Sequence, residues 1–251
     1  MLSENISLNP KDIAIVGLPF DEFSSFMKGP AKAPQEIRKL LHNGSMNMCA
    51  ESGIDLSETG RLKDMGDFKP ISHPEDVVKP LCEIIDKGAH LISLGGDHSL
   101  SYGTIKAHSK YYQGLTVLHL DAHPDLHEEY DGNLYSHACP FARVMEQGLA
   151  SRLIQVGIRT LTPHQKNQAD KFGVEIIQMK DWSPTMNLNL EGSVYLSFDI
   201  DVLDPSYAPG ISHHEPGGMS TRDAIDFLNN QKMNLIGADI MEYNPTGILM
   251  V

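Results

Sequence analysis

The segment VLHLDAHPDL, residues 117–126, places three side chains that can bind a metal at every second position: Asp121, His123 and Asp125. Alternate residues of a β-strand lie on the same face, so these three groups would face one region of space. Charged groups gathered in this way either repel each other or coordinate a cation. The spacing therefore identifies a candidate metal site, which the remaining chemistry-bearing segments must support or exclude.

Similar polar groups follow other apolar segments. The motif GGDHS (95–99) follows Leu94, DID (199–201) follows Phe198, and ADIMEYN (238–244) ends the last apolar segment. Each has a structural explanation when taken alone, since Asp97 or Ser99 could cap a helix. Together, however, they would bring four carboxylates to one edge of a sheet, and such a group needs protons or bound cations: Asp121, Asp125, Asp199 and Asp201.

Divalent metal is the better explanation for so many carboxylates at neutral pH. Roughly six candidate ligands exceed the needs of one ion, whereas carboxylates that bridge two ions roughly 3.5–4 Å apart account for the number. Carboxylate oxygens mixed with a few imidazoles suit Mn²⁺, and ligand type alone leaves Zn²⁺, Ni²⁺ and Co²⁺ as alternatives. A calcium-binding EF-hand loop is excluded, because its sixth position would be Leu126 and its twelfth Gly132.

The elements that must position these groups are short apolar segments separated by helix-length intervals. The predicted strands are residues 13–18, 90–94, 115–120, 152–158, 194–200 and 234–240, and helices are predicted over 99–112 and 221–231. Strands alternating with helices predict a parallel sheet covered on both faces, with ligands bound at the carboxyl ends of the strands. We expect one domain over residues 1–251, with irregular loops at 19–35 and 203–218.

The composition excludes several classes of partner. The net charge is −13, with 33 acidic and 20 basic side chains and no basic run, so nucleic acid and anionic membranes are not expected partners. No apolar run approaches the ~20 residues that span a bilayer. The N-terminal segment has neither a basic start nor an apolar centre, so we expect a cytoplasmic protein without a secretion signal.

The motifs GGDHS, DAHPD and SFDIDVLDP, in this order and at these intervals, resemble those of the ureohydrolases, the family of arginase and agmatinase. The resemblance runs from about Val16 to Pro245. It implies a three-layer α/β/α fold with a central, mostly parallel sheet, and a homotrimer or homohexamer. It also implies two manganese ions per chain, the first held by His98, Asp121, Asp125 and Asp199, and the second by Asp121, His123, Asp199 and Asp201.

The resemblance also implies roles for residues outside the metal ligands. His137, Asp125 and Glu242 would be catalytic, with His137 transferring a proton and Glu242 holding the guanidinium by paired hydrogen bonds. Asn133 would contact the tail of the substrate. His213, in the segment SHHEPGG, could line the substrate entrance, bind metal or serve only the loop.

A small cationic guanidino compound is the substrate class that this resemblance implies. A guanidinium is a poor electrophile, so its hydrolysis needs hydroxide, which two metals can generate at neutral pH, and an acid for the departing amine. We favour agmatine, which would give putrescine and urea, over L-arginine, which would give ornithine. The SHHEPGG segment is nevertheless closer to plant-type arginases, because agmatinases often carry Thr-Pro before Glu-Pro-Gly-Gly.

Three alternatives remain at this point. Guanidinobutyrate could be the substrate, or a formimino group could be cleaved on the same metals. The chain could also be a catalytically impaired homologue, because its sequence after Pro245, TGILMV, departs from the longer segment that family members normally carry. We interpret that segment as shortened or altered.

Overall fold

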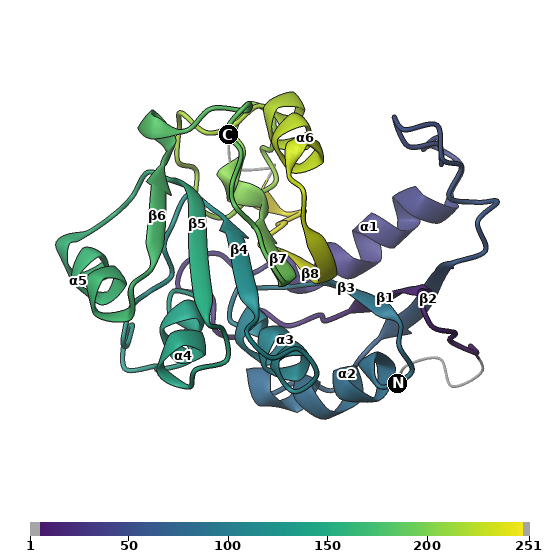
Figure 1. Cartoon of the computed structure of the whole chain (residues 1–251), viewed down its shortest axis with the longest axis horizontal. Coiled ribbons are helices and arrows are strands. Elements are labelled where there is room, and N and C mark those ends of the chain that lie inside the picture. Colours follow the sequence, from purple (N-terminus) through teal and green to yellow (C-terminus); the bar gives the residue numbers. More distant parts are fainter. Residues whose placement is uncertain (1–5, 248–251) are drawn as a thin grey trace.

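Eight parallel strands form one sheet in the order β2-β1-β3-β8-β7-β4-β5-β6, and the computed structural model describes residues 6–247 (Figure 1). The strands are β1 (Ile13–Gly17), β2 (Leu62–Asp67), β3 (His90–Leu94), β4 (Thr116–Leu120), β5 (Arg152–Ile158), β6 (Glu175–Gln178), β7 (Ser193–Asp199) and β8 (Asn234–Met241). The helices are α1 (Ala33–His42), α2 (Val78–Ile85), α3 (Leu100–Ser109), α4 (Pro140–Glu146), α5 (Pro163–Phe172) and α6 (Thr221–Asn230).

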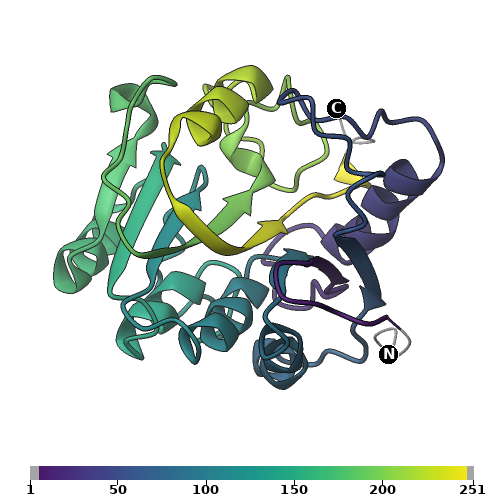
Figure 2. The same ribbon diagram turned by 45° about the vertical axis from the view of Figure 1, so that its right-hand side comes forward.

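Helices cover both faces of the sheet. The helices α2, α3, α4 and α5 pack side by side on one face, whereas α1 and α6 lie on the other (Figures 1 and 2). This arrangement confirms the predicted three-layer α/β fold, and the sheet is parallel throughout. No helix within residues 6–247 is long and apolar enough to cross a membrane.

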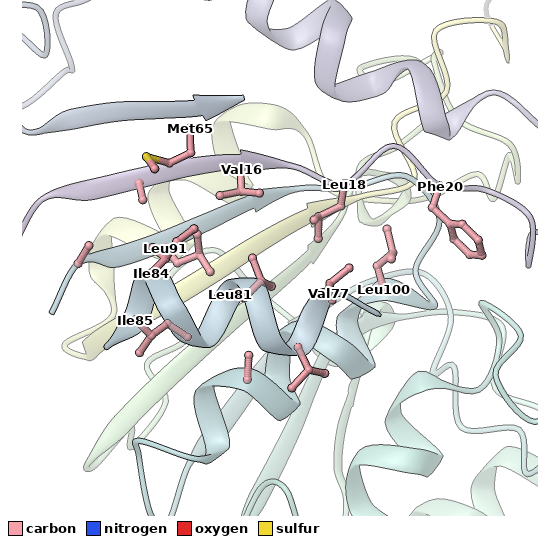
Figure 3. Close-up of a cluster of buried hydrophobic side chains, with 14 of the residues drawn as sticks. Val16, Leu18, Phe20, Met65, Val77, Leu81, Ile84, Ile85, Leu91 and Leu100 are labelled. Carbon is pink, nitrogen blue, oxygen red and sulfur yellow. The ribbon is translucent and has the colours of Figure 1, made fainter. Parts of the chain in front are cut away.

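Part of the core lies between α2 and the strands β1 and β3 (Figure 3). Leu81 and Ile84 of α2 pack against Val16 and Leu91 of the sheet, and all four side chains are buried. Each fully buried aliphatic side chain of this kind contributes about 1.5–3 kcal/mol. This packing fixes the strand ends that carry the candidate site.

Most predicted elements are present, and one prediction was wrong in part. The predicted loop at 19–35 is irregular only as far as Gly29, because a 3₁₀ turn spans Pro30–Lys32 and α1 begins at Ala33. Pro30 and Pro34 lie in the first turns of these two elements, where the fixed φ of proline favours helix and its missing N–H is not needed. The loop over 203–218 contains no helix or strand, as predicted. The segment after Pro245 extends into residues 248–251, which lie outside the described residues.

The four strands that precede the polar motifs are neighbours at the centre of the sheet. In the register of the sheet Leu94 pairs with Ile240, Asp199 with Met241, and Leu120 with Phe198, so β3, β8, β7 and β4 end at the same level. The loops that follow these strands therefore meet at one edge, where the ligands of parallel sheets bind.

Candidate active site

One half of the predicted metal site lies around His98, at the start of the segment leading into α3. Its Nδ1 atom is 3.1 Å from Asp121 Oδ2, 3.1 Å from Asp125 Oδ2 and 3.0 Å from Asp199 Oδ2. All four side chains are buried. The four residues predicted to hold the first ion are thus in mutual contact.

The other half lies around His123. Its Nδ1 atom is 3.0 Å from Asp201 Oδ2 and 3.4 Å from Asp121 Oδ1. Asp121 therefore faces His123 with one oxygen and His98 with the other. A carboxylate that bridges two ions presents its oxygens in this way.

The donor set fits divalent cations. Three carboxylate oxygens surround His98 Nδ1, but none of the described residues forms a hydrogen bond with this nitrogen. The contacts are therefore as short as those between ligands of one metal ion, although their angles do not suit hydrogen bonds. Burial and the neighbouring carboxylates of Asp201 and Asp121 raise the pKa of Asp199 well above its usual range. Burial raises the pKa of Asp201 to about 6, because its contact with His123 offsets only part of the cost. Buried carboxylates of this number need cations nearby to remain ionised.

His119 is a seventh imidazole or carboxylate at this edge, and it lies close enough to His98 and Asp121 to share an ion. Its ring contacts exclude that role. The amide nitrogen of Gln155 donates to the carbonyl of Pro124 at 2.6 Å and lies 3.0 Å from His119 Nδ1, so Nδ1 is the acceptor. The ring hydrogen is then on Nε2, which donates to Asp121 Oδ2 at 2.7 Å. His119 therefore orients Asp121 and has no lone pair left for a metal.

A buried network supports His98 from behind. Its Nε2 lies 3.1 Å from the hydroxyl of Ser197, which donates to Asp239 Oδ1 at 2.7 Å. Asp239 Oδ2 accepts further hydrogen bonds from Thr104 and Tyr195. A partner on the second nitrogen fixes the ring orientation of a metal-binding histidine.

His137 and Glu242, the predicted proton donor and guanidinium partner, form an ion pair. His137 Nδ1 is 2.9 Å from Glu242 Oε1, which also accepts from the backbone N–H of His98 at 2.9 Å. Burial opposes the positive charge, but the carboxylate of Glu242 raises the pKa of His137 to about 9. Glu242 Oε2 has no hydrogen-bond partner among the described residues.

Two of the predicted catalytic residues have strained backbones. Asp125 has φ 48° and Glu242 has φ 61°, in the left-handed region that non-glycine residues rarely adopt. Such conformations cost of order 1–3 kcal/mol and persist where the surroundings impose them, often at functional sites.

These groups open onto a cavity of about 380 Å³. It is lined by Ser25, His123, Asp125, His127, Tyr130, His137, Ala138, Thr160, Thr162, Gln165, Asp199, Asp201, His213 and Glu242. His213 lies between two site histidines, with its ring centre 5.6 Å from that of His137 and 5.7 Å from that of His123. His213 thus lines the cavity, and its three predicted roles remain predictions.

Among the residues predicted to bind the substrate, Asn133 is the one that does not line this cavity. It lines an adjacent hollow with Glu22, Asp131 and Ser136, and its Oδ1 accepts from the backbone N–H of Tyr135 at 2.9 Å. The amide is therefore engaged in shaping its own loop, away from the metal ligands. The prediction that it contacts the substrate remains a prediction.

Three residues at the site were not identified from the sequence. His119 precedes Asp121 by two positions, so the alternation that selected Asp121 and His123 would also have selected it. Gln155 lies inside the apolar run of β5, where a single buried amide is a weak signal. Ser25 lies in a loop that is 112 residues from His137, and no local pattern marks it.

Comparison with known proteins gives one consistent result. The model of the Arginase family matches residues 11–247. An arginase of Glycine max is 44% identical over 251 residues, covering 92% of this chain and 71% of that protein. The solved structure of an arginase from Medicago truncatula superposes with a TM-score of 0.85 at 37% identity, covering 94% of this chain and 80% of that chain. An agmatine ureohydrolase of Thermoplasma volcanium gives a TM-score of 0.80 at 28% identity, covering 95% of this chain and 86% of that chain.

Proposed function

Since the chain belongs to the arginase family of hydrolases, which act on guanidino C–N bonds, we propose that it hydrolyses L-arginine to ornithine and urea. The observation that carries the proposal is that Glu242 lies beside the buried cluster of candidate metal ligands. Its Oε2 atom has no partner among the described residues, and Glu242 lines the same cavity as Asp125, Asp199 and Asp201. A guanidinium N–H would satisfy that oxygen in a charge-assisted hydrogen bond.

The six ligands divide into the two sets that the sequence predicts. His98, Asp125, Asp121 and Asp199 would hold one ion, and His123, Asp201, Asp121 and Asp199 the other. We propose Mn²⁺ for both, because the donors are mainly carboxylate oxygens with two imidazoles. When bound, two such ions supply the Lewis acidity that makes water nucleophilic at neutral pH.

The protein itself positions the substrate and supplies the proton. Glu242 would hold the guanidinium beside the ligand cluster, with its orientation fixed by the N–H of His98. His137 holds a proton at neutral pH, because Glu242 raises its pKa to about 9. It would give that proton to the departing amine. Without the proton the amine would have to leave as an unstable anion, which is a poor leaving group.

The tail of the substrate would occupy the part of the cavity away from the ligands, lined by Thr160, Thr162, Gln165, His127 and Tyr130. Relatives named arginase, at 44% and 37% identity, support L-arginine, and His213 in its plant-type segment lines the cavity. Agmatine, the substrate favoured from the sequence, is the second candidate. It is supported by the absence of lysine and arginine from the described lining of the cavity, since agmatine has no carboxylate to pair.

Urea release tests the proposal. Purified protein with Mn²⁺ or Ni²⁺ is assayed with L-arginine, agmatine, guanidinobutyrate and formiminoglutamate, and both urea and formamide are measured. We expect urea from L-arginine with the highest kcat/KM, and at least a hundredfold loss in Glu242→Gln because one charge-assisted pair is removed. A preference for agmatine would revise the substrate alone, whereas formamide as the product, or no product with any substrate, would overturn the proposed reaction.

A further inference from the structure

Ser25 caps the side of His137 that faces away from Glu242. Its hydroxyl lies 2.8 Å from His137 Nε2, and its backbone N–H donates to the same nitrogen at 3.2 Å. His137 is only 7% exposed, whereas Ser25 is exposed and lines the cavity. Both residues line the cavity, and the hydroxyl lies at the imidazole nitrogen that does not contact Glu242.

The loop that carries Ser25 is tied to the site at two points. Phe23 donates its N–H to Asp97 Oδ2 at 3.0 Å, and its carbonyl accepts the N–H of His137 at 3.2 Å. Asp97 is fully buried at the end of β3. The backbone of Phe23, two residues before Ser25, is therefore bonded both to His137 and to a buried side chain, and these contacts place Ser25 beside the imidazole.

Three groups contact the imidazole of His137: the carboxylate of Glu242, the backbone N–H of Ser25 and the hydroxyl of Ser25. They differ in whether they can donate or accept a hydrogen bond. Glu242 holds His137 Nδ1, so the proton that His137 exchanges is the one on Nε2. A backbone N–H can only donate and therefore supports the neutral ring, whereas a hydroxyl can accept from the protonated ring and donate to the neutral one. Of the two groups of Ser25 at Nε2, only the hydroxyl can remain bonded in both protonation states.

We propose that Ser25 relays a proton between His137 and the cavity. Nε2–H of His137 passes its proton to Ser25 Oγ while the hydroxyl hydrogen of Ser25 passes to the acceptor in the cavity, so that one proton is transferred in total and the hydroxyl is regenerated. The inference rests on the proposed function for the identity of that acceptor, the departing amine. The part of the inference that concerns the control of His137 by Ser25 does not depend on the proposed function.

The test compares Ser25→Ala with Ser25→Thr, which keeps a hydroxyl, and with Ser24→Ala as a matched control on the same loop. The titration of His137 is followed by ¹⁵N NMR of the imidazole in metal-free protein, with the signal assigned by its loss in His137→Gln. In Ser25→Ala we expect the pKa of His137 to fall by about one unit, because a charge-assisted hydrogen bond to the cation is lost and the N–H that favours the neutral ring remains. Ser25→Thr and Ser24→Ala should leave it unchanged.

Kinetics with Mn²⁺ supplied test the relay itself. Ser25→Ala should lower kcat about tenfold with KM nearly unchanged, as expected when proton transfer is impaired and binding is not, and should move the alkaline limb of kcat to lower pH. Ser25→Thr should restore both. An unchanged titration of His137, or an unchanged kcat and pH profile, overturns the proposal. No urea release from the unmodified protein would instead overturn the proposed function, while the titration still decides whether Ser25 governs His137.

Discussion

At the scale of single residues, Asp121 is the side chain on which both halves of the candidate metal site depend. Its Oδ2 lies 3.1 Å from His98 and its Oδ1 lies 3.4 Å from His123. His123, in contrast, contacts only the half that includes Asp201. The two residues therefore separate the contribution of a bridging ligand from that of a terminal ligand.

We predict that Asp121→Asn loses most of both ions and that His123→Asn loses chiefly one. An amide at position 121 keeps the shape of the side chain but removes the charge that two cations share, whereas position 123 serves one cation. Metal content per chain is measured by mass spectrometry after dialysis against a fixed concentration of Mn²⁺. Equal losses in the two variants would contradict the proposed division of ligands.

Gln155 acts on the same site without touching the predicted ions. Through one amide nitrogen it holds the carbonyl of Pro124 and the Nδ1 of His119, which in turn orients Asp121. We predict that Gln155→Met lowers Mn²⁺ affinity roughly 10–100-fold, the usual effect of losing a partner of this kind. Competition with a fluorescent chelator measures the dissociation constant.

A second buried glutamine provides the control for Gln155. Gln168, on α5, is 5% exposed and lies outside the residues that line the cavity. Gln168→Met should leave the Mn²⁺ dissociation constant within about twofold, because no chain of hydrogen bonds within residues 6–247 leads from it to a candidate ligand. If Gln155→Met and Gln168→Met lost Mn²⁺ affinity equally, the loss would reflect disturbed packing in general. The hydrogen bond from Gln155 to His119, on which the tautomer of His119 was assigned, would then have no specific effect on the site.

At the scale of elements, the turn after β3 brings three segments together at Gly96. Its carbonyl accepts from Glu242, and the next residue, Asp97, donates its N–H to the carbonyl of Phe20 at 2.9 Å. A Cβ on Gly96 would lie 1.7 Å from that carbonyl oxygen, so the segment can approach only because position 96 has no side chain. The loop that carries Ser25 and the segment after β8 that carries Glu242 are held by this contact.

We predict that Gly96→Ala lowers the free energy of unfolding by about 2 kcal/mol or more, since the clash is with backbone and cannot be relieved by a side-chain rotation. Chemical denaturation monitored by circular dichroism gives the value. Gly114→Asn is the control, because nothing lies within 4 Å of its Cβ position and asparagine tolerates its φ of +67°. It should cost no more than about 1 kcal/mol.

The elements also show why some of the fold could be predicted from the sequence and some could not. β3 and β5 have the predicted bounds, because strands buried on both faces read as apolar runs. β2 and β6 are the two edge strands, and LKDMGD and EIIQ are too polar or too short to stand out. The candidate metal ligands were identifiable because they lie at the ends of apolar runs or within five residues after them. The contact of Ser25 with His137 depends on how two loops are folded over the sheet, which no local pattern encodes.

At the scale of the whole molecule, stability at low pH depends on two buried groups, Asp97 and His108, which respond to acidification in opposite ways. Burial raises the pKa of Asp97 to about 7, so the native protein binds a proton there that the unfolded chain binds only near pH 4, and acidification down to that range is stabilising. His108 has the opposite effect. It is fully buried beside Tyr195, close to Gly237, and burial lowers its pKa to about 4.

The contribution of His108 has a definite sign. The native protein keeps the ring neutral, whereas the unfolded chain takes up a proton below about pH 6.5, so the stabilising contribution is complete above that pH and is lost as the pH falls towards 4. One pKa unit corresponds to about 1.4 kcal/mol, so between pH 6.5 and 5 the loss is about 2 kcal/mol.

We therefore predict that His108→Gln is less stable than the unmodified protein at pH 7.5, and that the difference narrows by about 2 kcal/mol at pH 5, because glutamine does not titrate. The free energy of unfolding is measured by denaturant titration with a chelator present at both pH values. The comparison between variants removes the opposing effect of Asp97, which both proteins share. If the difference in free energy of unfolding between His108→Gln and the unmodified protein did not change with pH, the ring would not be held neutral in the folded protein.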